Sequence, residues 1–309
     1  FNALTKQRAL AANYPFATIE PNTGMVAVPD ERLGVLAEMY KTEKIVPATV
    51  EFVDIAGLIA GASKGEGLGN KFLANIRECE IICHVVRAFY DDNITHVENN
   101  VNPKRDIEVI QTELALADID TLEKFVPKLV KDTKSGDKDA IRRLDEAKGV
   151  LEELKGGAVS VGNVEGLQLL TAKPVVYMFN VDMEAGFDKG ALEGLVAPAK
   201  CVFVDAKLEA EMAEMDEADK AEFLESYGVE EDGLKALVRA TYDTLGLQSY
   251  LTAGVKEVRA WTIKKGDTAP KAAGVIHTDF EKGFIAASVI NYADLVMQEG
   301  DVVEFRFNV

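Results

Sequence analysis

The sequence predicts an α/β protein built on a parallel sheet, and four buried strands are the basis of this prediction. Apolar, β-branched runs occur at residues 49–54, 81–89, 173–180 and 200–204. Stretches with helical periodicity separate the runs, as at residues 70–78. Strands that alternate with helices form parallel sheets, which bind ligands at the carboxyl ends of their strands. Polar residues at those ends are therefore the functional candidates.

Length and composition indicate a globular protein with two or three domains. The chain has 309 residues, of which 48% are hydrophobic and 28% are charged. It contains no apolar stretch of about 18 residues and no signal-peptide pattern at its start, so we expect a cytoplasmic protein without a membrane partner. Cys79, Cys83 and Cys201 are an odd number without a second pair of metal ligands, so free thiols are expected.

A helical insertion interrupts the predicted sheet. Between residues 106 and 167, apolar side chains recur at intervals of three and four residues on both sides of a polar turn at residues 134–137. This pattern predicts an antiparallel helical hairpin. Its charged faces are interpreted as solvated surface, with a docking arm as the alternative.

The sequence pattern changes again after Leu247. Short strand-like runs separated by Gly and Pro predict a small β-rich domain at residues 248–309; they lie at 255–263, 274–278 and 301–309. The sheet domain then comprises residues 1–105 and 168–247.

Net charge limits the classes of partner. The chain carries −18 at pH 7, which argues against non-specific adhesion to nucleic acid and gives no support for sequence-specific DNA binding. From Gln248 onward, seven basic residues face eight acidic ones, so the other −17 lies upstream. Contact with RNA is therefore least unfavourable in the C-terminal region. The charged residues at 209–225 are interpreted as a solvated helix face.

Long strings spread along nearly the whole chain resemble a known family. Residues 1–5 (FNALT) are similar to the helix after a Walker A motif, and residues 13–22 (NYPFATIEPN) to a switch I segment. Residues 52–58 (FVDIAGL) and 65–73 (GEGLGNKFL) resemble switch II, while 252–261 and 274–284 resemble a TGS domain. These strings together resemble the YchF/Obg-like ATPases, which are P-loop NTPases with an inserted helical hairpin and a ubiquitin-like α+β C-terminal domain.

The resemblance implies an ATP-hydrolysing regulatory switch that uses Mg²⁺, with the ribosome or its RNA as partner. The family's phosphate-binding P-loop is expected upstream of Phe1. Two alternatives remain: an Obg-type GTPase, and a ribosome- or RNA-docking module in which nucleotide hydrolysis is vestigial.

The first group of candidate residues belongs to the phosphate side of the site. Asp54 ends a buried strand and suits a carboxylate that holds Mg²⁺ through water, with a strand-end cap as the alternative. Thr18 is a second candidate for the metal. Gly57 has no Cβ, so its backbone N–H can approach a γ-phosphate. Leu58 stands where Ras-like enzymes have a water-orienting Gln, and an isobutyl group cannot form hydrogen bonds, which predicts slow intrinsic turnover.

The second group belongs to the base side. The resemblance implies that Asn180 exchanges hydrogen bonds with adenine. Met183 stands where the family has a Glu, and its thioether cannot form a carboxylate's paired bonds to guanine; this favours ATP over GTP. The remaining candidates for this side follow two of the predicted strands: Val181, Asp205, Ala206 and Lys207. For the last three of these, a plain strand-to-helix turn is the alternative interpretation.

Overall fold

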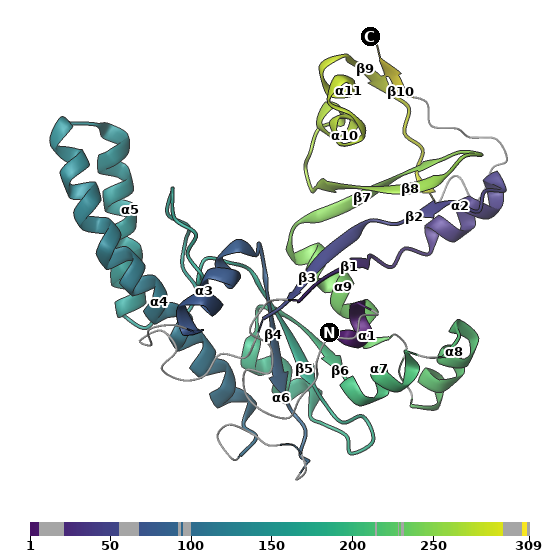
Figure 1. Cartoon of the computed structure of the whole chain (residues 1–309), viewed down its shortest axis with the longest axis horizontal. Coiled ribbons are helices and arrows are strands. Elements are labelled where there is room, and N and C mark those ends of the chain that lie inside the picture. Colours follow the sequence, from purple (N-terminus) through teal and green to yellow (C-terminus); the bar gives the residue numbers. More distant parts are fainter. Residues whose placement is uncertain are drawn as a thin grey trace. The chain divides into compact units, whose positions relative to one another are not determined.

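A computed structural model gives the structure of the chain (Figure 1). It describes residues 1–5, 22–55, 68–91, 94, 100–213, 215–227, 229, 232–292 and 305–307. The chain forms two compact units. Unit 1 comprises Phe1–Gly24 and Phe52–Leu234, and unit 2 comprises Met25–Glu51 and Lys235–Val309. Residues 25–51 thus group with the C-terminal region in unit 2.

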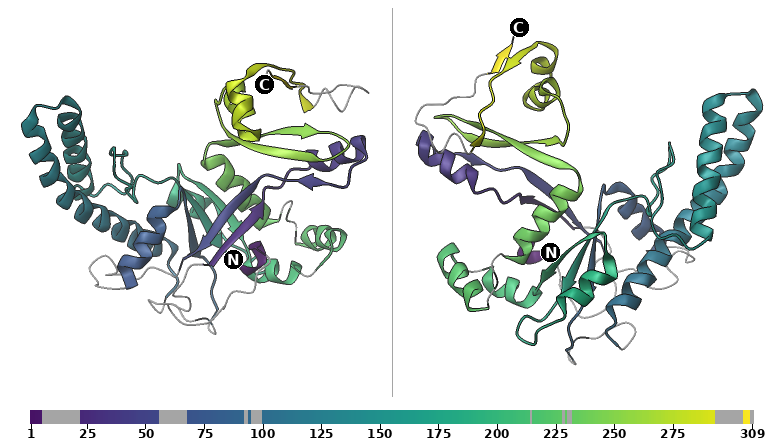
Figure 2. Two further views of the ribbon diagram at one scale, coloured as in Figure 1. Left: turned by 45° about the horizontal axis from the view of Figure 1, so that its top comes forward. Right: turned by 180° about the vertical axis from the view of Figure 1, so that it is seen from behind.

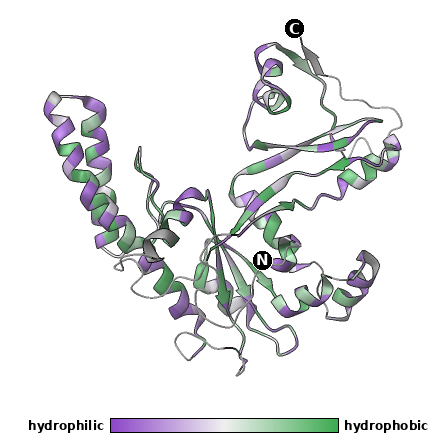
Figure 3. Ribbon diagram, viewed as in Figure 1, coloured by the Kyte–Doolittle hydropathy of each residue, from purple (hydrophilic) through white to green (hydrophobic). Residues whose placement is uncertain are grey.

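Unit 1 is built on the predicted parallel sheet. β4 (Ile82–Arg87), β5 (Val175–Asn180) and β6 (Lys200–Val204) lie in the order β4-β5-β6, and both pairings are parallel. Their apolar side chains fill the core, where Phe179 and Val176 are completely buried. Figure 3 shows the strongly hydrophobic character of these strands. The parallel sheet is thereby confirmed, and three of the four predicted strands form it.

The fourth predicted strand pairs differently. β3 (Thr49–Asp54) forms a two-stranded sheet with β1 (Asn22–Ala27) rather than joining β4. Among the described residues the expected single sheet is therefore divided into two. The sequence pattern of residues 49–54 predicted a buried strand but contained no information about its neighbour.

Helices connect and flank these strands. They are α1 (Asn2–Thr5), α3 (Leu68–Glu78), α6 (Lys189–Val196), α7 (Ala206–Met212) and α8 (Glu217–Ser226). The next helix, α9 (Gly233–Thr244), begins in unit 1 and lies mostly in unit 2. α1 confirms the helix expected at the start of the chain, and it lies against α7. No helix in the described part of the chain is long and apolar enough to cross a membrane.

The predicted hairpin is present. α4 (Pro103–Asp132) and α5 (Lys138–Lys155) run antiparallel and are joined by the short 3-10 helix η2 (Thr133–Ser135). Gly136 closes the turn with a φ of 76°, a left-handed conformation that favours glycine. Leu122 and Ala147 are completely buried between the helices. At 1.5 Å per residue α4 is about 45 Å long, and it projects from the sheet in every view (Figures 1 and 2).

A buried carboxylate fixes the base of this hairpin. Asp118 of α4 is 0% exposed, and its Oδ2 accepts hydrogen bonds from the backbone N–H and the hydroxyl of Thr171, each at 2.8 Å. A guanidinium nitrogen of Arg77, on α3, lies 3.6 Å from Asp118 Oδ1. Arg77 also donates to Thr121 and to the carbonyl of Gln168. We call Arg77, Asp118 and Thr171 the hairpin root.

Unit 2 combines a three-stranded sheet with short helices. β2 (Ile45–Val46) pairs parallel with β8 (Val258–Lys264), which pairs antiparallel with β7 (Leu247–Ala253). β9 (Phe284–Ala287) pairs antiparallel with β10 (Phe305–Phe307). The helices of unit 2 are α2 (Arg32–Tyr40), α10 (Ala269–Ile276) and α11 (Thr278–Lys282).

One predicted strand in this region is wrong. Residues 274–278 form the end of α10 and the start of α11, not a strand. Pro270 lies in the first turn of α10, where proline is favoured, and alanines follow it. The apolar run Gly274–Ile276 is the last turn of this helix, and three apolar residues are too few to distinguish a helix from a strand.

Candidate nucleotide-binding site

The carboxyl edge of the parallel sheet brings two predicted segments together. Asn180 ends β5 and lies in register with Val204, the last residue of β6. The backbone N–H of Val181 donates to the carbonyl of Val204 at 2.9 Å, which continues the pairing one residue beyond the strand. Val181 is 2% exposed, so it contributes backbone rather than side chain.

Asn180 links the two loops that follow these strands. Its side-chain Oδ1 accepts a hydrogen bond from the backbone N–H of Ala206 at 3.1 Å. Its backbone carbonyl accepts from Ala88, after β4, at 2.8 Å. Because Oδ1 already has this partner, the side-chain NH₂ is the group that remains for a ligand.

Asp205 completes the connection between the loops. Its Oδ2 accepts from the backbone N–H of Met183 at 3.0 Å, while its Oδ1 accepts from Lys207 and Leu208 and caps the start of α7. The positive end of the helix dipole also stabilises a carboxylate at the N-cap. Asp205 is therefore a structural clamp, whereas the Lys207 side chain is exposed to solvent.

The next two side chains bear on the choice of base. Met183 packs against the apolar cluster of Val86, Tyr177 and Phe179. Glu184 is exposed and accepts a hydrogen bond from the hydroxyl of Tyr227 at 3.2 Å. The sequence offered no signal for the contact with Tyr227, which lies 43 residues away.

Only part of the predicted phosphate side lies among the described residues. Asp54 is half-buried at the end of β3, and it forms no hydrogen bond or ion pair with any described residue. Thr18, Gly57 and Leu58 lie outside the described residues. In the described part of the chain no group of three or more His, Cys, Asp and Glu could hold a metal ion. A magnesium ion bound through phosphates, water and one carboxylate needs no such group, so Asp54 fits that role.

A buried acid lies on the helix that follows the base loop. Glu209 of α7 is 6% exposed, which corrects its assignment to a solvated face. Burial and, secondly, the nearby charge of Asp232 raise its pKa to about 7. Its Oε1 accepts from the backbone N–H of Leu234, in the first turn of α9. A Cβ at Gly233 would lie 2.9 Å from the carbonyl of Phe203, so glycine permits this close approach.

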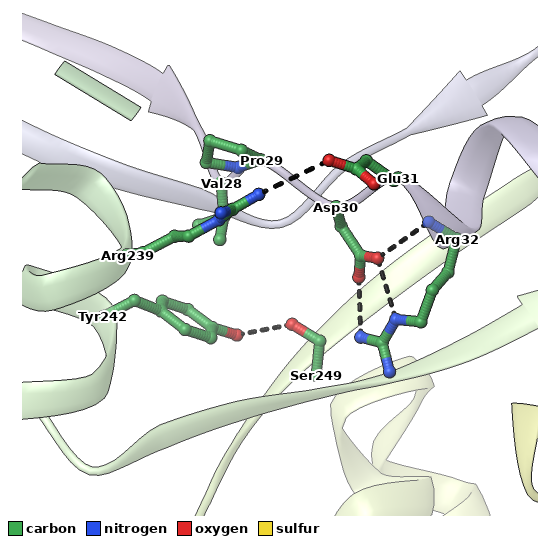
Figure 4. A pocket seen from close by; sticks show the side chains of 8 residues that line it. All are labelled: Val28, Pro29, Asp30, Glu31, Arg32, Arg239, Tyr242 and Ser249. Carbon is green, nitrogen blue, oxygen red and sulfur yellow. Dashed lines mark hydrogen bonds and ion pairs between the residues drawn. The ribbon is translucent and has the colours of Figure 1, made fainter. Parts of the chain in front are cut away.

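Unit 2 contains a pocket of about 450 Å³ whose polar groups are engaged with one another (Figure 4). Asp30 binds the Arg32 guanidinium at 2.7 and 2.8 Å. The hydroxyls of Tyr242 and Ser249 lie 2.7 Å apart. The pocket contains none of the predicted site residues, and nothing in its chemistry indicates a ligand.

Two protein-family models match the chain. Residues 1–122 match a model described as "50S ribosome-binding GTPase". Residues 247–298 match the model of the YchF GTPase C-terminal region, described as a protein of unknown function.

Curated relatives cover the chain completely. The "Ribosome-binding ATPase YchF" of Haemophilus influenzae is 50% identical over 350 residues, covering 100% of this chain and 95% of its own length. The proteins of the same description from Pasteurella multocida and Bacillus subtilis are 49% and 46% identical, with the same coverage. A solved structure, the "Schizosaccharomyces pombe YchF GTPase", matches with a TM-score of 0.80 and 33% identity over 99% of this chain and 93% of that one.

The parallel sheet, the paired loops at its carboxyl edge and these matches define a P-loop NTPase of the GTPase-like class. Within this class, the chain belongs to the YchF family.

Proposed function

We propose that this chain is an ATP-hydrolysing switch that acts on the ribosome. The observation that carries the proposal is the double connection between the loops after β5 and β6, from Asn180 to Ala206 and from Met183 to Asp205. Such a connection builds a base-binding edge, in a chain 49–50% identical to ribosome-binding ATPases. The proposed site of action is the cytoplasm.

Adenine is the base that this edge favours. The NH₂ of Asn180 can donate to the N7 atom of a purine. The Met183 thioether packs on the core and cannot accept the two hydrogen bonds that guanine offers a carboxylate. Asp205, whose oxygens accept from three backbone N–H groups, is not available to replace it.

GTP is the second candidate substrate, because the matched yeast structure is described as a GTPase. Glu184 offers a carboxylate one residue beyond Met183, but that carboxylate accepts from Tyr227. The use of GTP requires Glu184 to leave this partner.

On the phosphate side, Asp54 and Thr18 hold Mg²⁺, and Gly57 offers its backbone N–H to the γ-phosphate. When bound, Mg²⁺ neutralises negative charge on the β- and γ-phosphates. Leu58 provides no hydrogen bond to the attacking water, so the intrinsic rate is slow and a partner is needed to raise it.

We assign a TGS-like domain to residues 248–309, beside an NTPase domain at 1–105 and 168–247 and a hairpin at 106–167. The YchF C-terminal model at residues 247–298 supports the assignment. So does the packing of α10 on the β7–β8 sheet, where the Tyr250 hydroxyl donates to the carbonyl of Ala272 at 2.9 Å.

Nucleotide titration of the full-length protein tests the base preference. ATP should bind at least about tenfold more tightly than GTP, a difference of about 1.4 kcal/mol. Equal affinity, or tighter binding of GTP, would replace the ATPase assignment with the GTPase one. Removing the Tyr227 hydroxyl by Tyr227→Phe frees Glu184 and should narrow the preference.

Phosphate release in the presence of Mg²⁺ tests the metal assignment. Asp54→Asn is nearly isosteric and should remove most Mg²⁺-dependent turnover while the protein still folds. The matched control is Glu51→Gln, an exposed acid on the same strand, which should leave turnover unchanged. Turnover that survives Asp54→Asn would place the metal on other residues.

A further inference from the structure

The end of the helical hairpin is rich in positive charge, although the chain as a whole is acidic. Residues 124–143 contain seven basic and three acidic side chains, a net charge of +4 in a protein of −18. Four exposed lysines lie around the turn between α4 and α5: Lys128, Lys131, Lys134 and Lys138. We call these four residues the basic tip.

The basic tip differs in its pairing from two other lysines of the hairpin, Lys124 and Lys155. Lys124 lies 2.6 Å from Asp120, and Lys155 lies 2.8 Å from Glu123. For the four lysines of the basic tip, no ion pair with another described residue is present. Their charges are therefore directed to solvent.

Lys131 lies in the last turn of α4, where the helix dipole favours a positive charge, but the spacing of the lysines on α4 and the position of Lys138 do not stabilise the hairpin. Lys124, Lys128 and Lys131 are spaced four and three residues apart, so they are neighbours on one face of α4. Like charges at such spacings cost a helix about 0.2–0.5 kcal/mol per pair. Lys138 is the first residue of α5, where the helix dipole disfavours a positive charge. The folding of the hairpin does not explain a cluster of this kind, whereas an anionic partner does.

The sequence favoured the C-terminal region for contact with RNA, but several basic residues of that region are ion-paired. Arg259 lies 3.2 Å from Glu257 and stacks on the ring of Trp261. Lys265 is paired with Asp243, and Lys271 lies 3.8 Å from Asp267. Carboxylates within the same unit thus partly neutralise Arg259, Lys265 and Lys271.

We propose that the basic tip is an RNA-docking surface that contacts the phosphate backbone of ribosomal RNA. The proposal rests on the proposed ribosome-binding function and specifies where contact is made. Ribosomal RNA is a dense polyanion, and unpaired lysines bind its phosphates with release of counterions. Exposed Val130 and Ile141 beside the lysines, 41% and 44% exposed, leave apolar surface for a partner at the same place.

The experiment measures co-sedimentation of the full-length protein with ribosomes, and with purified ribosomal RNA, over a series of salt concentrations. The tip variant combines Lys128→Gln, Lys131→Gln and Lys134→Gln. The matched control combines Lys104→Gln, Lys148→Gln and Lys155→Gln, which removes the same charge from the same hairpin away from the turn. A third variant, Lys256→Gln with Lys264→Gln, tests the C-terminal unit.

We expect the tip variant to lose at least tenfold in affinity and to reduce the slope of log affinity against log salt by about 2–3. The control should remain within about twofold of the original protein, and ATP hydrolysis without ribosomes should be unchanged in all variants.

Three results would overturn the proposal. Equal losses in the tip and control variants would indicate a net-charge effect, and a loss confined to the C-terminal variant would move the contact to unit 2. The third result is that the original protein binds ribosomes but not purified RNA, and that the tip variant no longer binds ribosomes. The partner of the basic tip would then be an acidic ribosomal protein. If the original protein hydrolyses ATP but does not bind ribosomes, the ribosomal part of the proposed function fails as well.

Discussion

The hairpin root and the junction between α7 and α9 each bury a carboxylate, but the two acids face opposite charges. Asp118 at the root is 0% exposed and faces the guanidinium of Arg77 at 3.6 Å. Glu209 at the junction is 6% exposed and faces another acid, Asp232. Both accept backbone hydrogen bonds, so the difference lies in the second charge. A buried acid opposite a cation holds two segments together, whereas one opposite an acid is stable mainly when protonated.

The largest loss in the free energy of unfolding is expected from a substitution at the hairpin root. Asp118→Ala removes the acceptor for both donors of Thr171 and leaves Arg77 without its charge partner. Breaking one side of a buried, hydrogen-bonded pair typically costs 3–5 kcal/mol; because Arg77 is 26% exposed, we expect about 2–4 kcal/mol. Denaturant unfolding measures the loss.

Two variants accompany this measurement. Asp118→Asn keeps one acceptor for Thr171 and should lose less than Asp118→Ala. Asp120→Ala, on the same helix, removes an exposed acid paired with Lys124 and should change the free energy of unfolding by less than about 0.5 kcal/mol. Similar losses for Asp118→Ala and Asp120→Ala would remove the distinction on which the comparison rests.

The sequence contained a signal for one of these acids. Asp118 lies four residues from both Leu114 and Leu122, so it falls on the apolar face of α4, where a solvated acid is not expected. Glu209 follows Leu208 on a seven-residue helix, which is too short for its periodicity to reveal the buried face. In both cases the partner lies more than 20 residues away, and no local pattern identifies it.

Periodicity predicted the elements of the fold well and their partners poorly. β5, β6 and the two hairpin helices follow from their apolar patterns, because each pattern lies within its own segment. The separate pairing of β3 with β1 and the grouping of residues 25–51 with unit 2 depend on contacts between distant segments. The register of β5 and β6 brought Asn180 and Ala206 together as expected, but not the clamp formed by Asp205.

An intermediate effect is expected at the junction. The raised pKa of Glu209 means that the folded protein binds its proton more tightly than the unfolded chain does. Stability therefore falls as pH rises from about 4.5 to about 7, and stays lowered above that range. Glu209→Gln keeps an oxygen for Leu234 without the charge, so it should stabilise the protein by about 1–2 kcal/mol at pH 8 and by little at pH 4.5.

Thermal or denaturant unfolding at a series of pH values measures this difference. The control is Glu211→Gln, an exposed acid on the same helix, which should give no pH-dependent gain. A gain from Glu209→Gln that is equal at pH 4.5 and pH 8 would mean that packing, rather than ionisation, is responsible.

The smallest change in the free energy of unfolding is expected when only the charge of Asp232 is removed. Asp232→Asn removes the like charge beside Glu209 and still leaves an oxygen to accept from the backbone N–H of Leu234, at 2.8 Å in the original protein. Burial is the larger cause of the raised pKa of Glu209, so most of the shift should remain. We expect a gain of only about 0.5 kcal/mol at pH 8.

A double-mutant cycle distinguishes repulsion from other effects of the Asp232 substitution. In a Glu209→Gln background the repulsion is already absent, so Asp232→Asn should produce no further gain at pH 8. An equal gain in both backgrounds would assign the effect to the cap of α9 rather than to the pair of acids. Burial alone would then account for the raised pKa of Glu209, and the junction would differ from the hairpin root by lacking a cation such as Arg77 rather than by facing a second acid.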